Sequence, residues 1–281
     1  MAVGEEILAP PARLPARAST LRARRRRTLT QVGVVIGEVV LALLVWEIAV
    51  GSLRLVEPIF FPPPSAIGAA FADLLSRGVF ADHIPYSLRN FATGYVLAAV
   101  VGITAGLAIG SSYALGRLLG PVAWSLYAMP WISIRPATTI WFGFGAEPII
   151  FLVFLASLLP VLLNTMSGVR TVDPALLRAG RVFGGGRVQL WWKVVLPSAV
   201  PFVLTGLRLA VISGFIGLLV AELVGSSRGF GALVAIASSR FRVEEAFATI
   251  ALLVAISVTG VRAVGLLERH VSVWRTRSSS A

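Results

Sequence analysis

The sequence contains no cysteine, only two histidines (His83 and His270) and few charged residues. The absence of cysteine excludes disulfide bonds, thiolate nucleophiles and cysteine-ligated metal sites, and two distant histidines exclude a histidine metal cluster. Charged residues make up 14% of the chain and apolar residues 57%, whereas soluble domains are about 25% charged and about 45–50% apolar. This composition is typical of an integral membrane protein.

Six apolar segments are long enough to cross a bilayer, because a hydrocarbon core of about 30 Å requires about 20 helical residues. They lie at 31–53, 90–116, 118–142, 148–168, 197–224 and 246–267, and Pro130 and Pro136 interrupt the third. We predict an all-α integral membrane fold with six transmembrane helices in one domain, residues 31–274. Residues 1–30, rich in Arg, Ala and Pro, are predicted to form a disordered cytoplasmic tail, and residues 275–281 are predicted to form a cytoplasmic C-terminal tail. A cleaved signal peptide is the alternative for the first segment, but that segment is longer than a usual signal core and contains Glu38 and Glu47.

The chain is strongly basic, with a net charge of +12 and a single lysine, Lys193, among its 25 basic residues. With both termini in the cytoplasm, seventeen basic residues lie in inner segments and six in outer ones. That asymmetry follows the positive-inside rule, so we expect a multi-pass protein of the plasma membrane with cytoplasmic termini. Basic residues interspersed between bilayer-length apolar runs do not form a nucleic-acid-binding face, and membrane lipid is the expected environment.

Two further patterns concern packing. After the prolines at 62–64, apolar residues recur at helical spacing from Ser65 to Gly78, which predicts a short amphipathic helix on the outer face. It could pack on the bundle or headgroups, or it could form a docking ledge for an external partner. In the second span, small residues recur at every fourth position, which permits close approach of another helix in the same chain or in a second copy. These residues are Gly94, Ala98, Gly102, Gly106 and Gly110.

A polar segment, about 171–196, separates the fourth and fifth spans and has clear helix boundaries. Asp173 is a suitable N-cap, Pro174 suits the first helical position, and three glycines follow Phe183. A second short segment, 187–195, ends before Pro197. The predicted helix places Leu176, Leu177, Gly180 and Phe183 on one side. A helix of about ten residues is unstable alone and too short to span a bilayer, so it needs a packing partner.

This segment resembles the EAA loop of ABC-importer permeases, in which Glu-Ala-Ala is followed by three residues and a Gly, and nine further residues lead to an Ile/Val-x-Leu-Pro ending. Here the corresponding residues run from Asp173 to Gly184 and end at Leu196-Pro197. Flanking motifs are similar to those of the nitrate/sulfonate/taurine permease group. They include Phe61-Pro62-Pro63-Pro64-Ser65, Ser87-Leu88, Trp141-Phe142-Gly143-Phe144-Gly145, Thr205-Gly206-Leu207-Arg208-Leu209, Ala221-Glu222-Leu223 and 225–231.

The resemblance implies the type I permease fold, with a cytoplasmic coupling helix that docks in a groove of a separate ATPase. It also implies a second permease copy, two ATP-binding ABC subunits that hold ATP and Mg, and an extracytoplasmic solute-binding protein. This chain itself is expected to hold no cofactor and no metal and to catalyse no reaction. Arg178 replaces the motif's Glu, and Gly180 replaces its second Ala. The charge reversal at Arg178 suggests either an acidic partner in the ATPase groove or a salt-bridge role that has moved to another residue. The residues expected to couple to the ATPase are Leu177, Arg178, Ala179, Gly180, Phe183 and Gly184.

Charged residues within a span are costly and are candidates for function. Arg135 lies in the interrupted third span, and we expect it to give an anionic solute a transient contact, together with Trp131, Ser133 and Tyr127. The alternative is an ion pair with Glu38 or Glu147, or a guanidinium that extends to the interface. Glu222, near the outer end of the fifth span, is either part of an external gate or an interhelical contact. Arg208 is expected to anchor the loop or to extend toward the cytoplasmic interface.

No phosphate-binding loop is present, since Gly184-Gly185-Gly186 is followed by Arg187-Val188. A secondary transporter independent of ATPase subunits is the main alternative, but it predicts paired helix interruptions in two repeats. A lipid-acting membrane enzyme would need a polar cluster that two separated histidines do not supply. The expected function is therefore that of an ABC-importer permease, which moves a small solute by alternating access. The solute is expected to be an oxyanion, for example a sulfonate, nitrate, taurine or an aromatic carboxylate.

Overall fold

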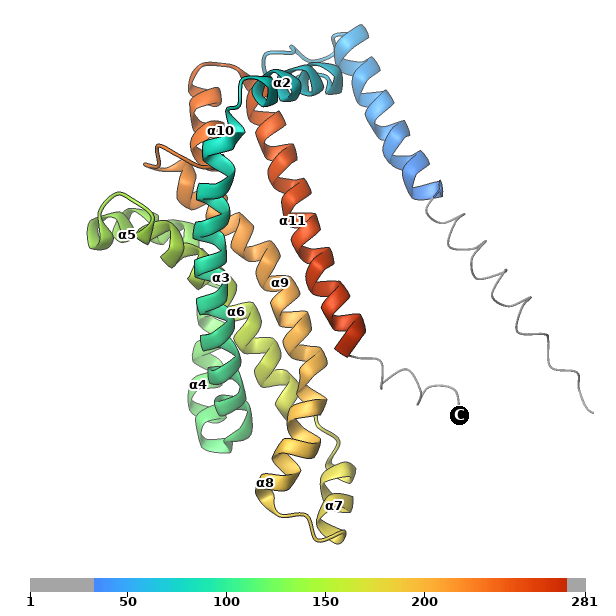
Figure 1. The fold of residues 1–281 in the computed structure, drawn as a ribbon, viewed down its shortest axis with the longest axis vertical. Coiled ribbons are helices and arrows are strands. Elements are labelled where there is room, and N and C mark those ends of the chain that lie inside the picture. Colours follow the sequence, from blue (N-terminus) through green and yellow to red (C-terminus); the bar gives the residue numbers. More distant parts are fainter. Residues whose placement is uncertain (1–32, 272–281) are drawn as a thin grey trace, which may run out of the picture. The chain divides into compact units, whose positions relative to one another are not determined.

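The structure, a computed structural model, describes residues 33–271, without the side chains of residues 131–132 and 269–271. The described chain is helical and contains no strand (Figure 1). The predicted tails at 1–30 and 275–281 lie outside the described residues. Residue contacts divide the chain into two units, 1–65 and 66–281, and each is considered by itself.

Five described helices are long and apolar enough to cross a membrane. They are Gly33–Ser52, Phe80–Ser111, Glu147–Arg170, Arg187–Leu223 and Val243–Glu268. The all-α membrane architecture is as predicted. The count differs from six because the third predicted span, 118–142, is not one helix.

The described part of the first unit consists of the helix Gly33–Ser52 and the segment that follows it. The last six residues of this helix, η1 (Glu47–Ser52), are π-helical. The Trp46 ring stacks on the Phe61 ring, with centroids 4.8 Å apart. The Glu47 carboxylate accepts hydrogen bonds from the backbone N–H of Ser65 (2.9 Å) and from its hydroxyl (2.8 Å). Helix α2 (Pro64–Ser76) begins at Pro64, and the Glu47 carboxylate satisfies donors of its first turn.

In the second unit, α2 packs against the bundle, as one of the two alternatives predicted. Leu74 of α2 is buried in a cluster with Phe80 of α3 (Phe80–Ser111) and Ala248 of α11 (Val243–Val271). The expected amphipathic character follows from this contact, because Ile67 and Phe71 of the same helix face the cluster. α10 (Phe230–Ser239) packs beside α11 through Val234, Ala237 and Ala246.

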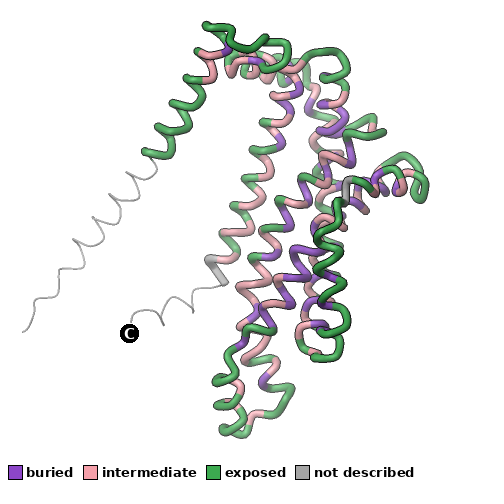
Figure 2. The backbone as a smooth tube through the Cα atoms, turned by 180° about the vertical axis from the view of Figure 1, so that it is seen from behind, coloured by how far each residue is buried: buried purple, intermediate pink, exposed green. Residues whose placement is uncertain are grey.

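The centre of the second unit is formed by α3, α6 (Glu147–Arg170) and α9 (Leu196–Leu223), and Figure 2 shows the buried residues concentrated along them. The small residues of α3 face α6 of the same chain. A methyl group on Gly94 would lie 2.7 Å from the Ile150 carbonyl oxygen, and one on Gly106 would lie 2.6 Å from Thr165 Cβ. The small-residue row therefore permits direct contact between the α3 and α6 backbones.

The third predicted span is two helices joined by a break. α3 ends at Ser111, so the predicted end of the second span at 116 was wrong. Ser112 has an extended backbone and caps α4 (Tyr113–Tyr127), which has only 15 residues. A short 3₁₀ turn, η2 (Trp131–Ile134), then leads into α5 (Arg135–Phe142), in which Pro136 occupies the first turn. Prolines at 130 and 136 disfavour a continuous helix because each lacks an N–H donor and restricts the preceding residue.

The segment after α6 contains α7 (Pro174–Val182), α8 (Arg187–Leu190) and the π-helical η3 (Trp191–Val195). The predicted end of the second short segment before Pro197 was wrong, because η3 continues directly into α9. Pro197 lies in the first turn of α9, directly after the π-helical hydrogen bonds of η3.

Candidate functional site

The α7 helix has the boundaries that the sequence predicted. The Asp173 carboxylate accepts a hydrogen bond from the Ala175 N–H at 2.7 Å, which satisfies a donor of the first turn. At the other end Gly184 has φ +77°, and the Gly185 N–H donates to the Gly180 carbonyl at 2.9 Å. This left-handed turn reverses the chain into α8.

No residue of α7 is buried by the described chain. Val182 and Phe183 are 84% and 90% exposed, and Leu176 is also exposed. Arg178, Ala179 and Gly184 are exposed as well, and Leu177 is half-buried. In Figure 1, α7 and α8 extend from one end of the bundle.

Gly180 differs from the other predicted coupling residues because it faces its own chain. A methyl group at this position would overlap Leu190 Cδ2 of α8. Gly180 therefore holds α7 against α8 and does not share the exposed side with Phe183.

Arg135 lies at the start of α5 and is 3% exposed. Its guanidinium donates to the carbonyl oxygens of Ala221 (2.9 Å) and Val224 (2.6 Å), at the C-terminal end of α9. It also donates to the Thr139 hydroxyl at 2.8 Å. Neither Glu38 nor Glu147 pairs with it in the described chain. The positive charge thus satisfies the free carbonyls and favourable dipole end of α9, and a solute contact by Arg135 stays a prediction.

Glu222 is fully buried and joins α9 to the start of α10. Its carboxylate accepts hydrogen bonds from the Ser87 hydroxyl (2.7 Å) and the Gly231 N–H (3.0 Å). The Ser87 hydroxyl accepts from the Phe230 N–H at 3.1 Å, and His83 Nδ1 accepts from the Gly229 N–H at 3.0 Å.

Three successive backbone donors at the α10 N-terminus are thus bound by side chains of α3 and α9. The geometry is that of an interhelical contact, and a gating role for Glu222 stays a prediction. Ser87 and the glycine-rich turn were noted as motifs, but the pairing of Ser87 with Glu222 could not be read from the sequence, because the two residues are 135 positions apart.

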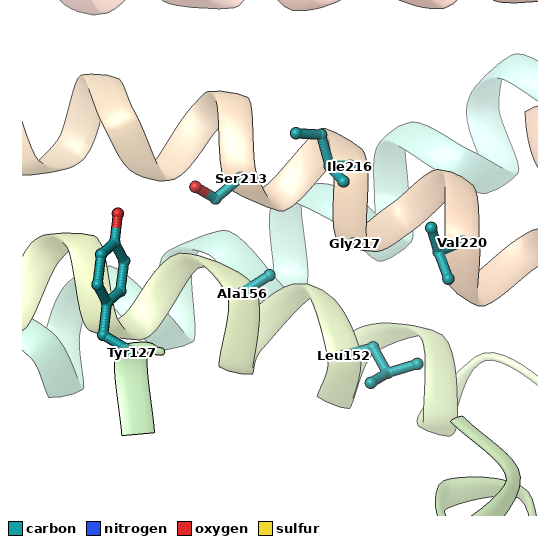
Figure 3. A pocket seen from close by; sticks show the side chains of 7 residues that line it. All are labelled: Tyr127, Leu152, Ala156, Ser213, Ile216, Gly217 and Val220. Carbon is teal, nitrogen blue, oxygen red and sulfur yellow. The ribbon is translucent and has the colours of Figure 1, made fainter. Parts of the chain in front are cut away.

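A cavity of about 280 Å³ lies between the end of α4, α6 and α9 (Figure 3). Tyr127, from α4, is the predicted path residue that lines it, whereas Ser133 is exposed elsewhere and the side chain of Trp131 is not described. The hydroxyls of Tyr127 and Ser213 are its polar groups. Sequence reasoning missed the other lining residues because they are ordinary apolar positions: Leu152, Ala156, Ile216, Gly217 and Val220.

Arg208 forms an ion pair with Glu268 of α11, and its expected role as a loop anchor or at the cytoplasmic interface stays a prediction. Its guanidinium lies against Gly265, where a methyl group would be 3.0 Å from Nη2. No group of three or more potential metal ligands occurs among the described residues.

Known proteins resemble this chain in sequence and in fold. Residues 98–273 match the family described as "Binding-protein-dependent transport system inner membrane component". The taurine transport system permease protein TauC of Escherichia coli is 31% identical, over 87% of this chain and 90% of its own length. The putative aliphatic sulfonates transport permease protein SsuC of Bacillus subtilis is 32% identical, over 89% and 90%.

A solved structure of the MetNI methionine ABC transporter, in an inward-facing conformation, has a similar fold. The likeness has a TM-score of 0.56 at 19% identity and covers 70% of this chain and 96% of the solved one. The flanking motifs, the family match and the fold agree. The chain therefore belongs to the binding-protein-dependent transport system inner membrane components, the transmembrane permeases of ABC importers.

Proposed function

We propose that this chain is the permease subunit of an ATP-driven importer for a small organic oxyanion of the sulfonate class. In this proposal a solute-binding protein delivers the solute outside, and two permease copies form the path. Separate ATP-binding subunits hydrolyse ATP with Mg on the cytoplasmic side. The relatives named for taurine and aliphatic sulfonates support the solute class.

The exposed side of α7 is the observation that carries this proposal. Leu176, Val182 and Phe183 leave large apolar surfaces uncovered by the described chain, although burying such a side chain is worth about 1.5–3 kcal/mol. A nine-residue helix is also too short to be stable by itself. Both features are accounted for if α7 inserts into a groove of an ATP-binding subunit.

The orientation follows from charge. The α7–α8 segment carries Arg178, Arg181, Arg187 and Lys193, and the positive-inside rule assigns such segments to the cytoplasm. With α4 and α5 together as the interrupted third crossing, both termini are cytoplasmic as well, and the α10 end of the bundle faces outward.

Transport by alternating access requires two packings of the helices with similar free energy, each favoured by a different partner. The break between α4 and α5 offers one place where the packing can change, and the cavity beside Tyr127 adjoins it. This cavity is lined by two hydroxyls and no charged side chain. A sulfonate would therefore be held weakly there, and selectivity would depend on the solute-binding protein.

Reconstitution tests the proposal directly. The permease, its ATP-binding subunit and the solute-binding protein are placed in proteoliposomes, and uptake of labelled taurine and of an alkanesulfonate is measured. We expect uptake that needs ATP and the binding protein and is lost in Phe183→Asp, with Phe241→Asp as the exposed aromatic control on the α10–α11 turn. Uptake driven by an ion gradient without the ATP-binding subunit would instead establish a secondary transporter.

A further inference from the structure

Another cavity, of about 620 Å³ and with a polar lining, lies where the end of α3, the start of α4 and the end of α6 meet. It shares no residue with the cavity beside Tyr127. Its lining combines two guanidinium groups with hydroxyls and closely packed glycines: Gly110, Ser111, Ser112, Tyr113, Gly116, Arg117 and Arg170.

The two arginines reach the cavity from different helices. Arg170 belongs to the last turn of α6, and its guanidinium lies directly over Gly116 of α4, where any methyl group would overlap it. Arg117 is the next residue of α4. Neither forms an ion pair with a carboxylate in the part of the chain that the structure describes. Two cations that line one cavity without a paired carboxylate favour binding of a negatively charged group.

The remaining polar groups also suit an anion. Ser112 caps α4, where the helix dipole leaves partial positive charge, and its hydroxyl accepts from the Leu115 N–H at 3.3 Å. Ser111 accepts a hydrogen bond from Trp191 Nε1 at 3.1 Å, so its own hydroxyl proton is free to donate elsewhere. The dipole at the C-terminus of α6 explains why a cation at Arg170 is favourable. It does not explain the second cation, Arg117, or the cavity that both residues line.

Aromatic residues typical of the membrane–water interface lie near the cavity. Trp191 and Trp192 pack edge to face beside it, and tryptophan is enriched at membrane–water interfaces. Tyr113 on the rim is exposed. In Figure 1 the α3–α4 turn lies at the same end of the bundle as α7 and α8, which extend further from it.

We propose that this cavity binds a phosphate-type oxyanion through Arg117 and Arg170. Guanidinium groups bind such anions in bidentate fashion, and the serine hydroxyls complete the set of donors. The two possible sources are the phosphate of an anionic phospholipid, which basic pockets between transmembrane helices bind, and free phosphate. The assignment of the cavity to the inner leaflet rests on the proposed function. The proposed binding of an oxyanion by Arg117 and Arg170 does not.

The bound anion would connect parts of the protein that otherwise have few contacts. It would bridge α4 to the end of α6, and through Ser111 and Trp191 it would adjoin the segment that carries α7 and α8. A bound anion in this cavity would therefore hold the start of α4 against the segment that contains α7 and α8.

Binding is measured on the purified full-length chain without other subunits, so the result is independent of transport. The lipid source is tested by native mass spectrometry of the chain with phosphatidylglycerol and with phosphatidylcholine. The free source is tested by equilibrium dialysis of labelled inorganic phosphate against the chain in phosphatidylcholine nanodiscs. Two variants are compared with the wild type. The double variant combines Arg117→Gln and Arg170→Gln. The single variant Gly116→Ala displaces the Arg170 guanidinium without changing the charge. Arg262→Gln is the control, since Arg262 is exposed on α11 away from the cavity.

We expect retention of phosphatidylglycerol over phosphatidylcholine, or binding of phosphate, to be weakened about thirty-fold in the double variant. That equals about 2 kcal/mol, since each basic group contributes about 1 kcal/mol and 1.4 kcal/mol is tenfold. Gly116→Ala should also weaken anion binding, and Arg262→Gln should leave it unchanged.

Loss confined to the lipid arm identifies the headgroup, and loss confined to the phosphate arm identifies free phosphate. Wild-type binding in the double variant, or equal losses in Arg262→Gln, would overturn the proposal. If ATP-dependent uptake fails while this binding persists, the proposed function fails alone.

Discussion

At the scale of single residues, the two buried charges Arg135 and Glu222 act on opposite ends of neighbouring helices. Arg135 donates to the last carbonyls of α9, and Glu222 accepts from the first turn of α10. Both charges complement the dipole of the helix end that they contact. The turn between α9 and α10 is thus held from α5 on one side and from α3 on the other.

Glu222→Ala should destabilise the protein by about 1–3 kcal/mol, because it leaves the Gly231 N–H and the Ser87 hydroxyl without their buried acceptor. Glu222→Gln should lose less, since its amide oxygen can still accept. Thermal unfolding in detergent measures the effect, with Glu57→Ala, an exposed carboxylate, as the control. Equal melting temperatures for Glu222→Ala and Glu57→Ala would show that the buried network contributes nothing.

Arg135→Leu should also lower the melting temperature, by an amount that corresponds to about 1–3 kcal/mol, since two carbonyls at the end of α9 lose their donors. Arg135→Lys should be intermediate, because one ammonium group cannot match the fork of the guanidinium. The KM for solute is measured in parallel. An increase in KM in Arg135→Leu that Arg135→Lys reverses, without any change in melting temperature, would establish the solute contact and contradict the anchoring role.

At the scale of helices, contact between α3 and α6 depends on the small-residue row. The sequence predicted that these residues mark a tightly packed face, and the spacing of four along one helix was sufficient for that. It could not identify the partner helix, since a glycine row fits any backbone that approaches closely. The closeness of Ile150, Val153, Val161 and Thr165 to the glycines identifies α6 as that partner.

Gly106→Ala should destabilise the bundle by about 1–3 kcal/mol, because even one methyl group would lie 2.6 Å from Thr165 Cβ and 2.8 Å from the Leu162 carbonyl oxygen. Gly68→Ala is the matched control, since no atom lies within 4 Å of a methyl group at that position in α2. It should be neutral or slightly stabilising, because alanine is the better helix former. The difference between the two melting temperatures tests the packing. Similar values for both variants would mean that α3 and α6 can separate without cost.

The boundaries of helices were less predictable than their existence. Asp173, Pro174 and the glycines after Phe183 marked α7 correctly, because each acts locally on the backbone. Pro130 and Pro136 indicated an interruption, but apolar composition alone made 118–142 resemble one span. The end of α3 at Ser111 was missed because Gly110, Ser111 and Ser112 interrupt the apolar run only briefly, and the extended backbone of Ser112 shows the boundary.

At the scale of the whole molecule, composition and charge were enough to predict a helical membrane protein, because a lipid-exposed backbone has to satisfy its own hydrogen bonds. The flanking motifs were enough to predict the family, which the comparisons confirm. The solute path was not predictable in the same way. Of the residues proposed for it, Tyr127 lines a cavity, whereas Arg135 and Glu222 are enclosed by helix ends. Those partners are distant in the sequence, and no local pattern records them.

The central claim is that α7 docks on an ATP-binding subunit at the inner face of the membrane. The natural absence of cysteine permits a direct measurement, since Phe183→Cys introduces the only thiol of the chain. The variant is assembled with its ATP-binding subunit and treated with a thiol-to-amine cross-linker. Phe241→Cys, at an exposed position directly after α10, is the control, and Figure 1 shows α10 at the opposite end of the bundle from α7. We predict a cross-linked permease–ATPase product from position 183 and none from position 241. A product from position 241 and none from position 183 would contradict the account.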